Sequence, residues 1–163
     1  TKFLSSANKA AAKAAGENSW CNATWLVEVK NGQPGKFVRA ADHGLAVAEM
    51  RKYMDGKEER EYEEKFLVTM VEGKPVALDP NDDKTPVVGD LFTDAVLPDG
   101  TQVKSGLQLL RESALEHTVG EWSGIAGLNA DDVAEVAREL TSHGKRAAVD
   151  IHRGPAQHSG CSG

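Results

Sequence analysis

The sequence predicts an α/β fold in which helices pack on a small, partly parallel sheet, with a β-hairpin-rich insertion in the first half. Three observations support this. Two pairs of apolar runs are joined by turn residues, apolar residues recur at helical spacing after residue 105, and a short apolar run follows the last helix. We therefore expect a hairpin-rich segment, residues 1–104, and a helix–helix–strand segment, residues 105–163, within one structural unit.

The start of the chain predicts a helix followed by a hairpin. Residues 4–15 are rich in alanine and lysine, which favour helix, and Gly16 is placed to end this helix in a left-handed turn. Residues 25–29 and 36–39 are apolar or alternating runs, and the Asn-Gly and Pro-Gly pairs between them favour a turn. We expect these two runs to pair as antiparallel strands.

The middle of the chain predicts a second hairpin between polar segments. Residues 46–54 are expected to form a short helix, and residues 55–65 an exposed linker, because this run is dense in charge and has little apolar face. Residues 66–71 and 75–78 flank a Glu-Gly-Lys turn and are expected to pair. Residues 79–90 are polar and contain proline, which indicates a loop.

Capping residues mark two helices after residue 104. Ser105 is placed to cap a helix that extends to about His117, with leucines and alanine at helical spacing. Thr118 is placed to cap a short helix through Ile125, and Gly127 follows as a helix breaker. The two helices are therefore expected to be separate.

The third helix of this half has the clearest signals. Asn129 is a strong N-cap residue, and Asp131 and Asp132 in the first turn favour the positive end of the helix dipole. His143, before a glycine, matches a helix C-terminus. One face carries the apolar residues Val133, Val136, Ala137 and Leu140. Residues 146–151 form a short apolar run that suits a buried parallel strand.

Composition excludes several classes of partner. The formal charge is −6, with 19 Lys plus Arg against 25 Asp plus Glu, so no overall positive field attracts nucleic acid or anionic lipid. The apolar runs fall short of the roughly 20 residues of a membrane-spanning helix. Cys21 and Cys161 could form one disulfide, so the sequence does not decide between an oxidising and a reducing compartment. The Thr start and polar tail suggest a piece of a longer chain.

A loop after the predicted strand carries the functional prediction. Its candidate ligand-binding residues are His152, Arg153, Gly154, Gln157 and His158. The loop follows the carboxyl end of a strand, the edge at which open α/β sheets bind ligands. Gly154 allows close backbone approach, Arg153 can pair with a phosphate or stack on a ring, and Gln157 offers a donor and an acceptor to a heterocycle. This chemistry suits a nucleotide-like or pterin cofactor; a polar loop without a ligand is the alternative.

The sequence around this loop is similar to a known family. Residues 129–147 resemble the helix–strand unit of the molybdopterin oxidoreductase family, and residues 143–158 look most like its tetrathionate reductase branch. Residues 20–26 and 103–110 are also similar to that branch, so the resemblance covers most of the chain.

The resemblance implies a role for the loop. In the family a Gly and a Gln of this loop contact the molybdopterin guanine dinucleotide, which carries over to Gly154 and Gln157. Arg153 and His158 are their neighbours, and His152 stands where many relatives have Gly, so the contact is expected to differ there in detail. The parent protein would hold molybdenum bis(molybdopterin guanine dinucleotide) and reduce tetrathionate to thiosulfate with two electrons.

The resemblance also implies partners that this chain does not contain. It implies the remainder of a catalytic subunit, an iron–sulfur electron-transfer subunit, a membrane quinol-oxidising subunit and a periplasmic location. No C-x-x-C spacing surrounds Cys21 or Cys161, so the parent's iron–sulfur cluster is expected to be ligated elsewhere. The isolated chain is expected to be inactive. Thiosulfate, polysulfide, selenate and arsenate remain open as substrates of the same scaffold.

Other sites receive weaker support. None of the five histidines has the spacing of a zinc protease motif, and residues 79–90 lack the glycine and glutamate of a calcium loop. Cys21 is expected to be a half-buried structural thiol beside Trp20. The alternative from a different class is a non-catalytic interaction domain whose acidic segments, residues 55–65 and 79–90, face a partner.

Overall fold

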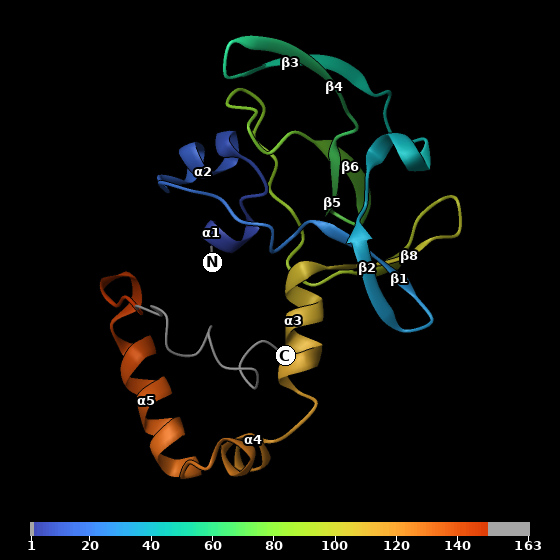
Figure 1. The fold of residues 1–163 in the computed structure, drawn as a ribbon. Helices are drawn as coiled ribbons and strands as arrows, with labels where there is room; N and C mark the ends of the chain where they lie inside the picture. Colours follow the sequence, from blue (N-terminus) through green and yellow to red (C-terminus); the bar gives the residue numbers. More distant parts are fainter. Residues whose placement is uncertain (1, 150–163) are drawn as a thin grey trace. The chain divides into compact units, whose positions relative to one another are not determined.

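The computed structural model describes residues 2–149, which fold as two compact units, residues 2–114 and residues 115–149 (Figure 1). The first contains α1 (Lys2–Ser5), α2 (Lys9–Ala15), β1 (Leu26–Lys30), β2 (Gln33–Phe37), the short 3-10 helix η1 (Ala40–His43), β3 (Glu49–Asp55), β4 (Glu58–Glu64), β5 (Leu67–Val71), β6 (Lys74–Leu78), β7 (Asp94–Val96), β8 (Gln102–Ser105) and α3 (Gly106–Ala114). The second contains α4 (Val119–Ala126), α5 (Ala130–Ser142) and the 3-10 turn η2 (Gly144–Arg146).

The predicted mixture of helices and strands is confirmed, but the prediction of a partly parallel sheet is wrong for the described residues. Their strands form one four-stranded sheet in the order β2-β1-β8-β7 and two hairpins, β3-β4 and β5-β6, and every pairing is antiparallel. Hairpin connections suffice to join antiparallel strands, whereas parallel strands need long crossovers. The short loops of the first unit therefore favour the antiparallel arrangement.

Both predicted hairpins form, and each turns on two residues with positive φ. In β1-β2 these are Asn31 (φ 53°) and Gly32 (φ 76°), and in β5-β6 they are Glu72 (φ 50°) and Gly73 (φ 75°). Two consecutive left-handed residues give the twist that matches the flanking strands. The local turn sequence therefore determines both hairpins.

The predicted first helix is interrupted. Ser6 and Ala7, both buried, separate α1 from the N-cap of α2: Ser6 pairs with Val88 in an isolated antiparallel bridge, and the Ala7 N–H donates to the Val87 carbonyl oxygen at 3.0 Å. Asn8 then caps α2, since its side-chain oxygen accepts from the Ala11 N–H at 3.0 Å. Gly16 ends α2 in the left-handed conformation (φ 72°), as predicted.

The predictions for residues 46–65 are wrong. In place of a short helix and a linker, β3 and β4 pair over their full length, from Glu49 opposite Glu64 to Asp55 opposite Glu58. The charges stabilise the strands by cross-strand contacts, such as Lys52 Nζ to Glu59 Oε1 at 2.8 Å. A strand with neither face buried lacks the alternation of apolar and polar residues by which strands are predicted from sequence.

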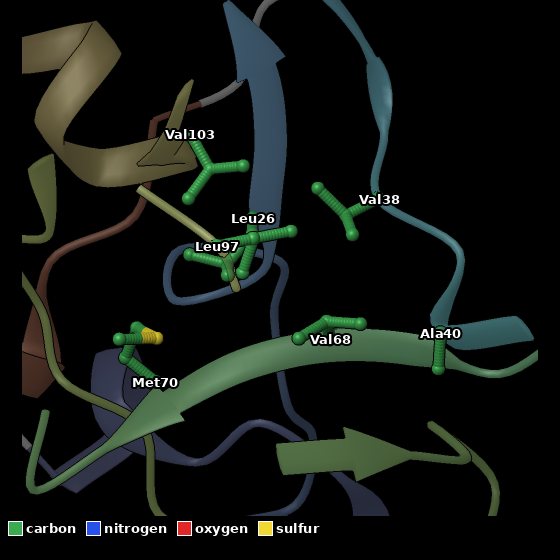
Figure 2. Close-up of a cluster of buried hydrophobic side chains, with 7 residues drawn as sticks. All are labelled: Leu26, Val38, Ala40, Val68, Met70, Leu97 and Val103. Atoms are coloured by element: carbon green, nitrogen blue, oxygen red, sulfur yellow. The ribbon is translucent and has the colours of Figure 1, made fainter. Parts of the chain in front are cut away.

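The hydrophobic core lies in the first unit. Figure 2 shows its central cluster, in which side chains from the four-stranded sheet, from β5 and from the adjoining segments point toward one another: Leu26, Val38, Ala40, Val68, Met70, Leu97 and Val103. Isolated bridges, Trp25 with Thr69 and Arg39 with Leu67, attach β5 to the β1-β2 hairpin. Two strands of this assembly, β7 and β8, were not expected from the sequence.

The predicted caps of the second half are confirmed. Thr118 and Glu121 form a reciprocal capping box at α4, and Gly127 ends that helix with φ 69°. Asn129 caps α5 by accepting from the N–H groups of Asp131 and Asp132. In the first unit, Ser105 Oγ accepts from the Gln108 N–H at 3.2 Å, although α3 ends at Ala114 rather than near residue 117. No helix within residues 2–149 has the length and apolarity to cross a membrane.

Candidate functional site

The predicted cofactor loop lies outside the described residues. All five of its candidate residues, His152, Arg153, Gly154, Gln157 and His158, follow residue 149. Their roles therefore stay predictions, and the structure describes only the segment that leads to them.

That segment is a helix followed by a tight turn. His143 is the C-cap of α5, and its ring Nε2 lies 2.8 Å from Glu139 Oε1, one turn back on the helix. Gly144 (φ 54°) opens η2, which leads to extended backbone at Ala147. Residues 147–149 form no strand, so the parallel strand predicted there is not found in its described part. The rest of that prediction lies beyond residue 149.

In the first unit, the fold gathers ionisable groups around His43. Glu28 lies in β1, His43 ends η1, and Asp99 lies in the turn between β7 and β8. His43 Nδ1 is 2.6 Å from Asp99 Oδ2, and Nε2 is 3.5 Å from Glu28 Oε1. The side chains of His43 and Glu28 are only 9% and 6% exposed. Three segments distant in sequence are thus joined at one imidazole ring.

Lysines determine the charge state at the inner end of this cluster. Burial raises the pKa of Glu28, but hydrogen bonds and charge from Lys30 and Lys36 outweigh it and hold the pKa below its ordinary value. The Nζ atoms of these lysines lie 3.3 and 3.4 Å from the Glu28 carboxylate. Glu28 is therefore a buried carboxylate that stays ionised at neutral pH.

Backbone contacts determine the charge state at the outer end. The Thr101 N–H donates to Asp99 Oδ1 at 2.9 Å, and this bond together with the contact from His43 lowers the pKa of Asp99 to about 2. Asp99 orients the imidazole, as carboxylates do in many hydrogen-bonded histidine pairs. Nε2 of His43 is buried and has no hydrogen-bond partner among the described residues.

The His43 cluster is better suited to holding the fold than to catalysis. A catalytic imidazole needs a substrate within hydrogen-bond reach. Here the ring is almost fully enclosed between two carboxylates on β1 and the β7-β8 turn. Sequence reasoning assigned His43 no role, because Glu28, His43 and Asp99 lie far apart in the sequence and meet only through the order of the strands.

A groove of about 450 Å³ lies near the base of the β3-β4 hairpin. Arg51 of β3 crosses it, with its guanidinium hydrogen-bonded to Asp79 and placed 5.4 Å from the centre of the Phe66 ring. The pairing with Asp79 raises the pKa of Arg51, so its charge is permanent. The wall also includes Asn8, Glu49, Asp82, Lys84 and Thr85. The charged groups here are largely paired with one another, which leaves the groove a weak candidate for binding an ion.

The described residues do not supply a metal centre. Within residues 2–149 no three or more His, Cys, Asp or Glu side chains are arranged to hold a metal ion. Cys21 is a free, half-buried thiol, as predicted, with Sγ 3.9 Å from the Leu4 carbonyl oxygen.

The chain is similar to the A subunits of large reductases, which confirms the predicted resemblance to the molybdopterin oxidoreductase family. The A subunit of selenate reductase from Mesobacillus selenatarsenatis is 38% identical over 160 residues, covering 98% of this chain and 14% of that protein. The A subunit of tetrathionate reductase from Archaeoglobus fulgidus is 28% identical over 164 residues, covering 97% of this chain and 12% of that protein. Its counterpart from Salmonella typhimurium is 33% identical over 144 residues, covering 86% and 12%.

These matches cover little of the relatives. The chain spans 12 to 14% of their length. No protein-family model matches the chain, and no solved structure matches it. The resemblance therefore rests on sequence identity along almost the whole chain.

Proposed function

We propose that this chain is a segment of the catalytic subunit of a molybdenum-dependent oxidoreductase that reduces a sulfur or selenium oxyanion. The observation that carries the proposal is the 38% identity to a selenate reductase subunit over 98% of the chain. Because the similarity includes both units, the whole segment, rather than a single motif, would be a part of such a subunit.

The segment would contribute a wall of the cofactor pocket through residues 152–158. When bound, molybdenum bis(molybdopterin guanine dinucleotide) supplies the two-electron chemistry, and the protein binds and orients it. Gln157 would donate to and accept from the pterin, Gly154 would allow the backbone to approach it, and Arg153 would face its phosphates. His152 and His158 would border this contact.

By the same resemblance, the ligands of the molybdenum and of the iron–sulfur cluster would come from other parts of the subunit, and no C-x-x-C spacing surrounds Cys21 or Cys161. An iron–sulfur electron-transfer subunit, a membrane quinol-oxidising subunit and a periplasmic location are part of the same proposal, by resemblance. In this arrangement the chain alone would show no activity.

Tetrathionate and selenate are the two candidate substrates. Reduction of tetrathionate breaks its central sulfur–sulfur bond and uses two electrons to give two thiosulfates. Reduction of selenate uses two electrons and two protons to give selenite and water. Both are assayed, because the names of the relatives divide between the two: tetrathionate is the substrate expected from the sequence, and the selenate reductase subunit has the higher identity.

The test is made on the full-length subunit with its partner subunits. Purified wild-type enzyme should contain molybdenum and oxidise a reduced viologen dye with tetrathionate or selenate as acceptor. Gln157→Ala should lower molybdenum content or turnover, because one pterin contact is lost. Gln33→Ala, an exposed residue of β2, serves as the matched control and should change neither. Equal molybdenum and turnover in both variants would remove Gln157 from the pocket.

A second candidate function is binding of another protein by the first unit. It is favoured by the β3-β4 hairpin, in which only Arg51 and Glu64 are partly buried and all other strand residues are exposed. The acidic residues of the 79–90 loop support it less, because Asp79 pairs with Arg51 and Asp90 accepts from the Gly73 N–H at 3.0 Å. Deletion of residues 50–63 should abolish partner binding under this reading and leave cofactor content unchanged.

A further inference from the structure

The two helices of the second unit form well but enclose no core of their own. Among the described residues 115–149, Ser123 is the only buried side chain, and all buried apolar residues within residues 2–149 precede residue 104. Yet α4 has a capping box and a left-handed C-cap, and α5 has an asparagine N-cap. The helices are thus specified locally and still present their apolar side chains to solvent.

These exposed side chains line two hollows. One, of about 280 Å³, lies between α4 and α5 and is lined by apolar residues that include Val119, Trp122 and Leu128. The other, of about 550 Å³, lies along α5 and is bordered by Val136, Leu140 and Ala147, with Glu135, Glu139 and His143 at its rim. Val136 is 67% exposed and Leu128 61%. Val136 and Leu140 belong to the apolar face of α5 that the sequence predicts, and within residues 115–149 their side chains stay 67% and 40% exposed.

Helices of this length need a partner. Isolated helices shorter than about 12 to 15 residues are marginal in water, and most helical stability in proteins comes from packing of an apolar face. Here α4 has 8 residues and α5 has 13. Caps contribute about 1 kcal/mol each, which cannot replace a core.

We infer that the α4-α5 face is a docking surface for another part of the same large subunit, an apolar helix or strand from outside residues 1–163 with basic groups at its edge. The inference rests on the proposed function. Relatives that match both helices are subunits of which this chain spans only 12 to 14% of the length, so ample polypeptide is available to cover the face.

Charge argues against a second copy as the occupant. Residues 115–149 contain six Asp and Glu against three Lys and Arg. Two copies joined through the α5 hollow would place Glu135 and Glu139 of each copy against like charges, which disfavours association. A partner with lysine or arginine at its edge would instead complement these two carboxylates.

Cysteine labelling tests the inference. Val136→Cys places a thiol on the docking surface. The matched control, Arg138→Cys, lies two residues further along α5 and places a thiol on the opposite, exposed side of the helix. Both variants are made in the 163-residue chain and in the full-length subunit, and maleimide labelling is followed by peptide-resolved mass spectrometry. In the 163-residue chain the two thiols should label at similar rates. In the full-length subunit the thiol at position 136 should label at least about tenfold more slowly, because labelling then waits for local opening.

The outcomes separate this inference from the proposed function. Equal labelling of the two thiols in the full-length subunit would overturn the inference. The inference would also be overturned if, in the 163-residue chain, the thiol at position 136 became more protected as the protein concentration rises. That result would favour a second copy as the occupant. Molybdenum content and dye-linked activity of the same full-length preparation report on the proposed function, and their absence would leave a protected thiol at position 136 as support for the docking surface.

Discussion

The two units of this chain are stabilised in different ways. The first unit encloses the cluster around Leu26, Val68 and Val103 between strands that are distant in sequence. The second has strong caps but no buried apolar side chain among its described residues. Local signals can therefore build helices whose stability comes from elsewhere, so a change to an apolar side chain should have different consequences in the two units.

Removal of a core side chain should show the largest contrast. Leu26 is fully buried, and Leu26→Ala should lower the free energy of unfolding of the first unit by about 3 kcal/mol, since it leaves a cavity. Leu140→Ala, on the exposed face of α5, should change the free energy of unfolding of the second unit of the 163-residue chain by less than about 0.5 kcal/mol. Urea-dependent hydrogen exchange, resolved by peptide, measures each unit separately. Equal losses would mean that the second unit has a core of its own.

Glycine substitutions should have opposite signs in the two units. A Cβ on Gly89 would lie 2.3 Å from Thr69 Oγ1 and 2.6 Å from Thr24 Cβ, so Gly89→Ala should destabilise the first unit by about 1 to 3 kcal/mol. A Cβ on Gly124 of α4 would meet nothing within 4 Å. Gly124→Ala should therefore stabilise α4 by up to about 1 kcal/mol, and a loss of helicity by circular dichroism would contradict the description of α4 as unpacked.

Loss of a cap should affect only the second unit. Thr118→Ala removes the hydroxyl that accepts from the Glu121 N–H at 3.2 Å, and should cost about 1 kcal/mol of α4 stability. Thr141→Ala is the control, because that hydroxyl caps no N–H group and donates back to the Ala137 and Arg138 carbonyl oxygens, at 2.8 and 3.2 Å. Faster hydrogen exchange should be confined to the α4 amides in Thr118→Ala. Slower folding or weaker core protection in residues 2–114 would show that the two units are coupled.

Acid should weaken the first unit through Asp99. Its pKa is lowered to about 2 in the folded protein, from an ordinary value of 3.8. The stability that this provides is fully present above the ordinary pKa and is lost as pH falls toward 2. Wild-type protein should therefore lose stability between about pH 4 and pH 2 more steeply than Asp99→Asn, measured by urea unfolding at each pH. Parallel curves would mean that Asp99 has no favourable contact in the folded state.

Local chemistry was enough to predict much of this fold. The turns at Asn31 and Glu72, the helix end at Gly16 and the caps at Thr118 and Asn129 each depend on residues within a few positions of one another. Such features are fixed by backbone conformation and short hydrogen bonds, which do not require knowledge of the tertiary structure.

Two hairpins with weak apolar patterns and one cluster that joins distant segments were missed. The β3-β4 hairpin has no buried face, so its apolar pattern is weak, although Gly56 with φ 65° provides a turn between the strands. The β7-β8 hairpin is short, and the Pro-Asp-Gly sequence at residues 98–100 was a turn signal that could have revealed it. The His43 cluster forms only because the strand order brings Glu28 and Asp99 together.

The proposed cofactor loop depends on the resemblance to reductase subunits and on the chemistry of its residues. Gly154 and Gln157 suit a pterin ligand by type, and the helix and turn that precede the loop form as expected. How Gly154 and Gln157 are arranged around a pterin would depend on the other residues of the pocket, which under the proposal belong to other parts of the subunit.

The most direct test of the central claim is the molybdenum content of the full-length subunit, purified with its partners and measured by plasma mass spectrometry together with the extracted pterin nucleotide. The account predicts molybdenum in stoichiometric amount, accompanied by molybdopterin guanine dinucleotide. A folded, full-length subunit that contains neither, when it is produced in cells that load other molybdenum enzymes, would contradict it.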